Sequence, residues 1–194
     1  MTFSPTTSPE FFERKYLLDE DPWHFATSAY ERQRYDELIS ALKGPRYKQA
    51  FEPGCSIGVF TERLANICDK VIAFDVSPTA VQRARARCNA IPNVQITCRS
   101  LTAEMDLCGS DLLVLNEIGY YFEEKDWDVL VGSLLRNLLP GSTVFASHWL
   151  GDSDDHLQSG DSIHRHLMKQ PHLLHVSGAK FTSFQLDKWV KRDD

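Results

Sequence analysis

Apolar and amphipathic stretches alternate along this chain of 194 residues. The stretches 70–75 and 111–115 are mainly apolar, which is typical of parallel strands covered on both faces. Further strands are predicted at 48–53, 94–98 and 143–147, with helices at 58–68, 78–89 and 124–138. This alternation predicts an α/β fold with a mostly parallel sheet, right-handed crossovers and helices on both faces.

Two helices are predicted ahead of the first strand. Ser8-Pro9 begins a helix over 9–19, which Asp21-Pro22 breaks. Ser28 caps a second helix at about 29–43. The apolar side of the first helix is predicted to hold Phe11, Phe12, Tyr16 and Leu17.

The C-terminal part is predicted to close the sheet. A polar loop at 150–160 precedes a short helix at 160–169, and two strands follow at 172–180 and 183–191. A hairpin between these strands makes the last one antiparallel. The connection 99–110 is too short for a full helix with its loops, so that crossover is expected to be reduced.

A glycine turn after the first strand carries the strongest functional signal. Gly54 and Gly58 allow close approach of a ligand to the backbone, and the following helix directs free N–H groups there. Asp75 lies 21 residues after Gly54, where a βαβ unit places an acid on a ribose. The dinucleotide fingerprint G-x-G-x-x-G fails, because Ser56 and Thr61 occupy two of the required positions. The pattern therefore predicts a nucleoside site that lacks the dinucleotide fingerprint. The alternative is an ordinary strand-to-helix turn in which Ser56 caps the helix and has no ligand-binding role.

The pattern E-x-G-C-x-x-G-x-F-T-x-x-L-A resembles the first motif of class I S-adenosylmethionine (SAM) methyltransferases. With Asp21-Pro-Trp-His-Phe25, Tyr30-Glu-Arg-Gln-Arg34 and Asn116-Glu-Ile-Gly-Tyr-Tyr121 in order, the chain resembles the nodulation protein S family up to about residue 150. The resemblance implies a seven-stranded Rossmann-like sheet, an N-terminal helical lid and SAM as methyl donor. It also implies methylation of an amine, since the named family member acts on a deacetylated chitooligosaccharide.

The cofactor site is predicted from the turn, the strand ends and the resemblance. Ser56 replaces the usual middle glycine, and Ser100 replaces the usual adenine-binding Asp. Trp23 is expected to be a lid residue or a core anchor, and Arg34 to bind the SAM carboxylate or to pair with Glu31. The predicted cofactor-binding residues are Trp23, Arg34, Glu52, Gly54, Cys55, Ser56, Gly58, Asp75, Val76, Ser100, Leu101 and Asn116.

Catalytic candidates follow the fourth and fifth strands, because open α/β sheets bind ligands at the carboxyl ends of their strands. An ammonium acceptor must lose a proton before it can attack, and His148 is the predicted base. Glu117, Tyr120 and Tyr121 are predicted to orient the acceptor. Ordinary structural roles are the alternatives: a loop histidine, a helix-start carboxylate and packing tyrosines.

Further acceptor contacts are predicted at Trp149, Asp161 and His164. Asp161 and His164 lie three residues apart at the start of a helix and so share a face, although a capping Asp and a solvated His are the simpler interpretation. No His and carboxylate spacing fits a closed metal site, so no metal is predicted.

Length, charge and composition narrow the possible classes of protein. The length predicts one domain, with a lid at 1–43, a cofactor core at 46–150 and a C-terminal part at 151–194. A net charge of −6 argues against general nucleic-acid binding. Five scattered cysteines predict reduced thiols. The polar N-terminus has no apolar signal stretch, so we expect a cytoplasmic protein, and we predict no membrane span. The alternatives to N-methylation are O-methylation of a sugar or secondary metabolite, and a SAM-binding module without turnover. The acceptor and the oligomeric state stay open.

Overall fold

The computed structural model describes residues 8–193, which form two compact units, Ser8–Ser100 and the residues from Leu101 onward. The boundary at residue 100 falls inside the predicted cofactor core. The predicted single domain and its three parts therefore stay a prediction.

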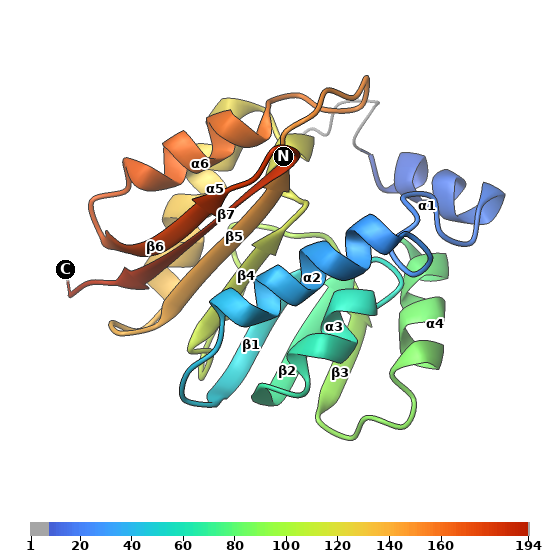
Figure 1. The fold of residues 1–194 in the computed structure, drawn as a ribbon, viewed down its shortest axis with the longest axis horizontal. Helices are drawn as coiled ribbons and strands as arrows, with labels where there is room; N and C mark the ends of the chain where they lie inside the picture. The colour runs from blue at the N-terminus through green and yellow to red at the C-terminus, as the bar shows by residue number, and fades with distance from the viewer. Residues whose placement is uncertain (1–7, 194) are drawn as a thin grey trace. The chain divides into compact units, whose positions relative to one another are not determined.

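The first unit has three parallel strands in the order β3-β2-β1, namely β1 (Tyr47–Pro53), β2 (Cys68–Asp75) and β3 (Val94–Cys98). Its helices are α1 (Pro9–Leu18), α2 (Ala29–Ala41), α3 (Val59–Leu64) and α4 (Pro78–Arg87). Helix α3 packs on β2 with α2 beside it, while α4 lies against β2 and β3 (Figure 1). Its core is apolar and includes the edge-to-face rings of Phe51 and Phe74.

Serine caps begin these helices as the sequence predicts. Ser8, Ser28 and Ser77 each accept a hydrogen bond from the backbone N–H three residues later. Two expectations in this unit are wrong. Leu17 is 68% exposed and does not face the core, and α3 ends at Leu64, four residues before the predicted end.

The second unit contains β4 (Leu112–Asn116), β5 (Thr143–Trp149), β6 (Leu173–Lys180) and β7 (Phe184–Lys191) in the order β4-β5-β7-β6. β4 and β5 are parallel, and β7 runs antiparallel to both of its neighbours, as the predicted hairpin requires. Its helices are the short η1 (Gly119–Tyr121), α5 (Glu124–Asn137) and α6 (Gly160–Met168). As Figure 1 shows, α6 lies along the sheet and packs on β5, β6, β7 and η1.

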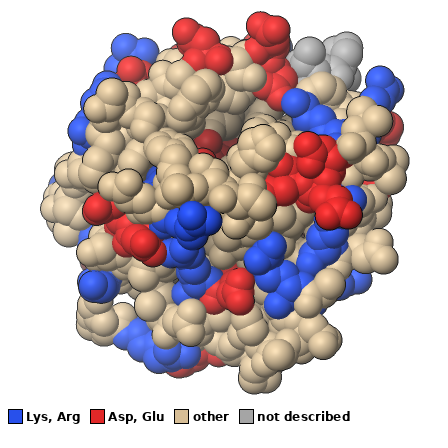
Figure 2. Space-filling view, turned by 45° about the vertical axis from the view of Figure 1, so that its right-hand side comes forward, with Lys and Arg blue, Asp and Glu red and all other residues tan. Residues whose placement is uncertain are grey.

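Segment 99–110 forms no helix, in agreement with the expected short crossover. β5 extends two residues further than predicted, so His148 and Trp149 belong to the strand and do not follow it. Acidic and basic side chains are interspersed on the face in Figure 2. Among residues 8–193, no helix is both long and apolar enough to cross a membrane.

Candidate functional site

The turn after β1 has three residues in the left-handed region. Gly54, Ser56 and Gly58 have φ values of 70°, 51° and 80°. A non-glycine residue pays about 1–2 kcal/mol for this conformation, so Ser56 keeps the backbone shape of a glycine at an energetic cost. Gly58 is also closely packed, since an added Cβ would lie 3.1 Å from Cα of Ala84. The turn therefore has the left-handed backbone that its glycines allow, and contact with a ligand there stays a prediction.

Asp75 ends β2 and holds this turn. Its Oδ2 accepts a 2.9 Å hydrogen bond from the Ser56 N–H, and its Oδ1 accepts a 3.0 Å bond from the Ser77 N–H. Burial raises the pKa of Asp75 to about 6, although these N–H groups oppose the rise. A carboxylate has about four acceptor positions, so both oxygens can also accept ribose hydroxyls.

Glu52 lies on β1, just before the turn, and is 2% exposed. Its Oε2 has no hydrogen-bond partner. Burial, together with the negative charge of Asp75, raises its pKa to about 8. Cys55 is also buried, and burial raises its thiol pKa well above the usual value, so the thiol is neutral, while its predicted contact with the cofactor stays a prediction. The open turn, an unpartnered polar atom and a strand-end carboxylate fit a nucleoside cofactor.

Helix α1 is attached to this turn and to α4. The Tyr16 hydroxyl donates a 2.6 Å hydrogen bond to Ser56 Oγ. Glu13 accepts hydrogen bonds from Ser77 Oγ and from both the N–H and the hydroxyl of Thr79, at 2.5, 3.1 and 2.6 Å. Trp23 packs edge-to-face on Tyr16, with ring centroids 5.5 Å apart, and stays half-buried. Trp23, the predicted lid residue, is therefore linked to the turn through Tyr16.

Arg34 follows the simpler of its two predicted roles. It is 1% exposed and forms an ion pair with Glu31, with Nε 2.9 Å from Oε2. The other predicted cofactor residues lie where the sequence places them, at or just after strand ends. These residues are Val76, Ser100, Leu101 and Asn116. Binding of a cofactor by them and by Arg34 stays a prediction.

The second unit gathers the acceptor-side candidates at the ends of β4 and β5. Glu117 follows β4 with a φ of 53°, and its N–H donates to the Ser147 carbonyl at 2.9 Å. Its Oε1 accepts a 3.0 Å bond from the Trp149 N–H, and its Oε2 accepts from the Tyr120 hydroxyl. The carboxylate is thus held between two strands while remaining half-buried.

A cluster of aromatic rings is joined to this carboxylate through Tyr120, whose hydroxyl bonds it. The buried Tyr120 ring stacks on His156, with centroids 3.9 Å apart and planes 10° apart. Tyr121 and Trp149 contact the same imidazole edge-on. Tyr121, Trp149 and His156 are half-buried residues. The structure therefore brings together Glu117, Tyr120, Tyr121 and Trp149, and adds His156, which sequence reasoning missed.

His148 lies deeper than predicted. It is fully buried, and its Nε2 accepts a 3.1 Å hydrogen bond from the Gly119 N–H. Its Nδ1 lies 3.2 Å from Nε2 of His164. Direct proton transfer between His148 and an acceptor stays a prediction.

Asp161 and His164 contact different strands of the β6–β7 hairpin, and contact of either with an acceptor stays a prediction. The Asp161 side chain is 48% exposed and accepts a 2.5 Å hydrogen bond from Lys180, whereas His164 is 1% exposed and so is not a solvated histidine. The Nδ1 of His164 lies 2.6 Å from Asp187 Oδ2. Asp187 and Glu13 were also missed, because their partners come from sequence-distant elements that no local pattern identifies.

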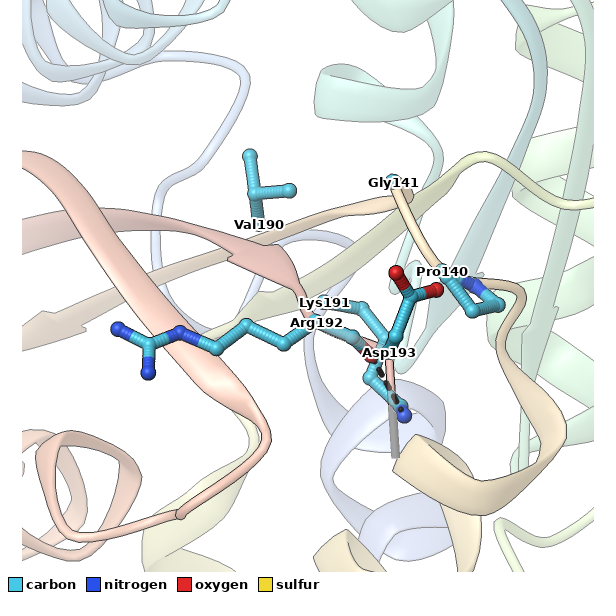
Figure 3. A pocket seen from close by; sticks show the side chains of 6 residues that line it. All are labelled: Pro140, Gly141, Val190, Lys191, Arg192 and Asp193. Carbon is cyan, nitrogen blue, oxygen red and sulfur yellow. Dashed lines mark hydrogen bonds between the residues drawn. The ribbon is translucent and has the colours of Figure 1, made fainter.

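A pocket elsewhere in this unit is lined by Pro140, Gly141, Val190, Lys191, Arg192 and Asp193 (Figure 3). It lies before the first residue of β5, at the opposite end of that strand from Trp149, and contains no predicted site residue. Within the described part of the chain, no group of three or more His, Cys, Asp or Glu residues is arranged to hold a metal ion.

The fold is that of class I SAM-dependent methyltransferases. It matches the crystal structure of the N-methyltransferase NodS from Bradyrhizobium japonicum in complex with S-adenosylhomocysteine, with a TM-score of 0.81 and 22% identity. The match covers 98% of this chain and 100% of that one.

Sequence comparison identifies the family. Residues 5–145 match the nodulation protein S (NodS) family. Nodulation protein S of Bradyrhizobium diazoefficiens is 33% identical over 70% of this chain and 65% of its own length. The Rhizobium tropici protein is 35% identical over 68% of this chain and 56% of its own length. The chain belongs to the nodulation protein S family, and it matches only 56–65% of the length of these two relatives.

Proposed function

We propose that this protein transfers a methyl group from SAM to the amine nitrogen of a small polar acceptor, such as an amino sugar or oligosaccharide. The observation that carries the proposal is the half-buried Glu117, whose carboxylate accepts hydrogen bonds from the Tyr120 hydroxyl and the Trp149 N–H, next to a cluster of the Tyr120, Tyr121, Trp149 and His156 rings. An ammonium group is attracted both to a carboxylate and to aromatic ring faces. Sugar rings also pack on aromatic surfaces, which suits an amino sugar.

The cofactor side of the proposal rests on the turn at Gly54–Gly58. Asp75 would accept the ribose hydroxyls, since each of its oxygens already accepts one backbone N–H and has a further acceptor position. Bound SAM supplies an electrophilic methyl group on its sulfonium. Tyr16 and Trp23 would cover the nucleoside and exclude water.

The acceptor side needs orientation and removal of one proton. Glu117 would accept a hydrogen bond from the acceptor ammonium and take one proton from it, which frees the nitrogen lone pair. The lone pair would then form the new carbon–nitrogen bond as the methyl–sulfur bond breaks, and S-adenosylhomocysteine would leave. The Tyr120 hydroxyl bond and the Trp149 N–H hold the carboxylate in one orientation. Positioning of this kind is a large part of catalysis in a reaction that needs little chemical activation.

Titration calorimetry with S-adenosylhomocysteine and with NAD tests the cofactor. We expect micromolar affinity for the former and no binding of NAD. Incubation with labelled SAM and either a chitooligosaccharide with a free amine or its fully acetylated counterpart tests the acceptor. Label only on the free-amine oligomer supports N-methylation, label on both supports O-methylation, and cofactor binding without transfer to either contradicts this acceptor class.

Glu117→Gln tests the mechanism. It keeps the shape of the side chain but removes the charge, so methyl transfer should fall at least tenfold while affinity for S-adenosylhomocysteine stays nearly unchanged. Glu123→Gln, a charge loss at the N-terminus of α5, is the matched control.

A further inference from the structure

A line of buried polar side chains crosses the second unit behind the aromatic residues. It joins His148 on β5, His164 on α6 and Asp187 on β7, which are 0%, 1% and 3% exposed. The distances are 3.2 Å from His148 Nδ1 to His164 Nε2, and 2.6 Å from His164 Nδ1 to Asp187 Oδ2. At the other end, the Gly119 N–H donates to His148 Nε2 over 3.1 Å.

The hydrogen bonds determine the tautomer of both rings. Asp187 accepts from His164 Nδ1, so that nitrogen carries the proton and Nε2 of the neutral ring is an acceptor. His148 Nδ1 must therefore carry a proton and donate a hydrogen bond to His164 Nε2. The Nε2 of His148 then has no proton, which the hydrogen bond that it accepts from the Gly119 N–H requires independently. Protonation of either ring would place two donors face to face, either at His164 or at Gly119.

Asp187 stays ionised in this arrangement. Burial acts to raise its pKa, but hydrogen bonds from His164, Gln185 and His175 hold that pKa below its usual value. His175 Nε2 lies 2.7 Å from Asp187 Oδ1, and Gln185 Nε2 donates to Oδ2 at 2.7 Å. The carboxylate is thus fixed from three sides.

Gly178 on β6 packs closely against this line, since an added Cβ there would lie 1.9 Å from Asp187 Oδ1. At the other end, an added Cβ at Gly119 would lie 2.8 Å from Cδ1 of Ile163 on α6. A side chain at either position would therefore displace a neighbouring side chain.

We propose that Asp187 and His164 are positioning residues that lock His148 in its Nδ1–H tautomer and thereby hold Gly119 and the η1 turn in place for the acceptor. This rests on the proposed function, because η1 carries Tyr120, whose hydroxyl bonds Glu117. His148 then supports the turn from behind and does not itself take the acceptor proton. The inference also assigns a role to Asp187.

One consequence concerns acidification. A second proton on His148 would occupy Nε2, so this atom could no longer accept the hydrogen bond from the Gly119 N–H. Titratable groups face this region from every element packed against it. They are Glu117 and Tyr120 near η1, Asp155 and His156 in the following loop, His164 on α6, His175 on β6 and Asp187 on β7.

Nitrogen NMR of the ¹⁵N-histidine-labelled protein tests the tautomer without any acceptor. We expect His148 and His164 both to carry the proton on Nδ1 at pH 7.5. Asp187→Ala removes the acceptor of the His164 Nδ1–H bond, so we expect both rings to lose their single tautomer and the Gly119 amide signal to shift. His166→Gln, on the same helix but paired with Asp128 and Gln170, should leave the His148 and His164 signals unchanged.

Activity supplies the second measurement. Asp187→Ala should lower kcat at least tenfold, with the KM for SAM nearly unchanged and no recovery at high pH. An Nε2–H tautomer of His148 in the parent protein overturns the proposal, as do unchanged His148 and Gly119 signals in Asp187→Ala. If that variant does not fold, the parent tautomers decide alone. Confirmed tautomers in a protein that methylates no amine would overturn the proposed function and leave the lock intact.

Discussion

The Tyr16 hydroxyl donates a 2.6 Å hydrogen bond to Ser56 Oγ, forty residues later in the chain. Ser56 has a φ of 51° at a position where such turns usually have glycine. The side chain that makes the turn costly is thus the one that attaches helix α1 to it. The departure from the usual motif gives this protein a contact that a glycine could not make.

Ser56→Gly and Tyr16→Phe, alone and combined, test this coupling. Glycine removes a strain of about 1–2 kcal/mol and loses a hydrogen bond of about 0.5–1.5 kcal/mol. Ser56→Gly should therefore be nearly neutral in the parent protein but stabilising by about 1 kcal/mol in the Tyr16→Phe background. Denaturant unfolding of the four proteins measures the difference, and equal effects in both backgrounds would show no coupling.

Asp75→Ala should lower the affinity for S-adenosylhomocysteine more than tenfold, because charge-assisted bonds to the ribose contribute about 1.5–3 kcal/mol each. The pKa of Asp75 is about 6, so the carboxylate takes up a proton as the pH falls below that value. Affinity in the parent should therefore decrease from pH 7.5 to pH 5. Asp75→Asn should bind weakly with little dependence on pH over this range, and calorimetry at several pH values compares the three proteins.

Glu13→Ala should loosen α1 without unfolding the sheet. The carboxylate accepts three hydrogen bonds at the start of α4, where the helix dipole also favours a negative charge. Hydrogen exchange over residues 10–35 should become faster, and bound S-adenosylhomocysteine should slow it in the parent. Glu10→Ala on the same helix is the control. Identical exchange with and without the ligand in the parent would argue against a lid.

The same carboxylate predicts a dependence on pH. Burial opposes the change, but the bonds from Ser77 and Thr79 lower the pKa of Glu13 below 4.5. Its contribution to stability is therefore present above the unfolded pKa and is lost as the pH falls through the lower folded value. The difference in melting temperature between parent and Glu13→Ala should shrink from pH 7 to pH 3.

Glu52 predicts the opposite sign. Its pKa is raised from 4.5 to about 8, so the folded state holds a proton that the unfolded chain has released. Stability of the parent should fall as the pH rises between these values. Glu52→Gln should lose less stability than the parent between pH 5 and pH 9, whereas the exposed Glu37→Gln should follow the parent. Thermal unfolding across this range decides between the two outcomes.

Local sequence determined most of the elements and the cofactor turn. Strand periodicity, serine caps and the Gly54–Gly58 spacing depend on residues within a few positions of one another, so β2, β3 and α4 lie close to their predicted bounds. Helix α3 is shorter than its sequence pattern predicts, and Leu17 is apolar but exposed. Local propensity could not predict the end of α3 or the exposure of Leu17, because tertiary packing decides which apolar positions are buried.

Only the tertiary structure decided the arrangement behind the acceptor side. His148, His164 and Asp187 come from a strand, a helix and a second strand, and their contacts span 16 and 23 residues. The register of β5 with β7 and the packing of α6 bring them together. A sequence shows which groups can titrate or donate hydrogen bonds. The fold decides which of them meet, because a hydrogen bond requires its two atoms to lie about 3 Å apart, whatever their separation along the chain.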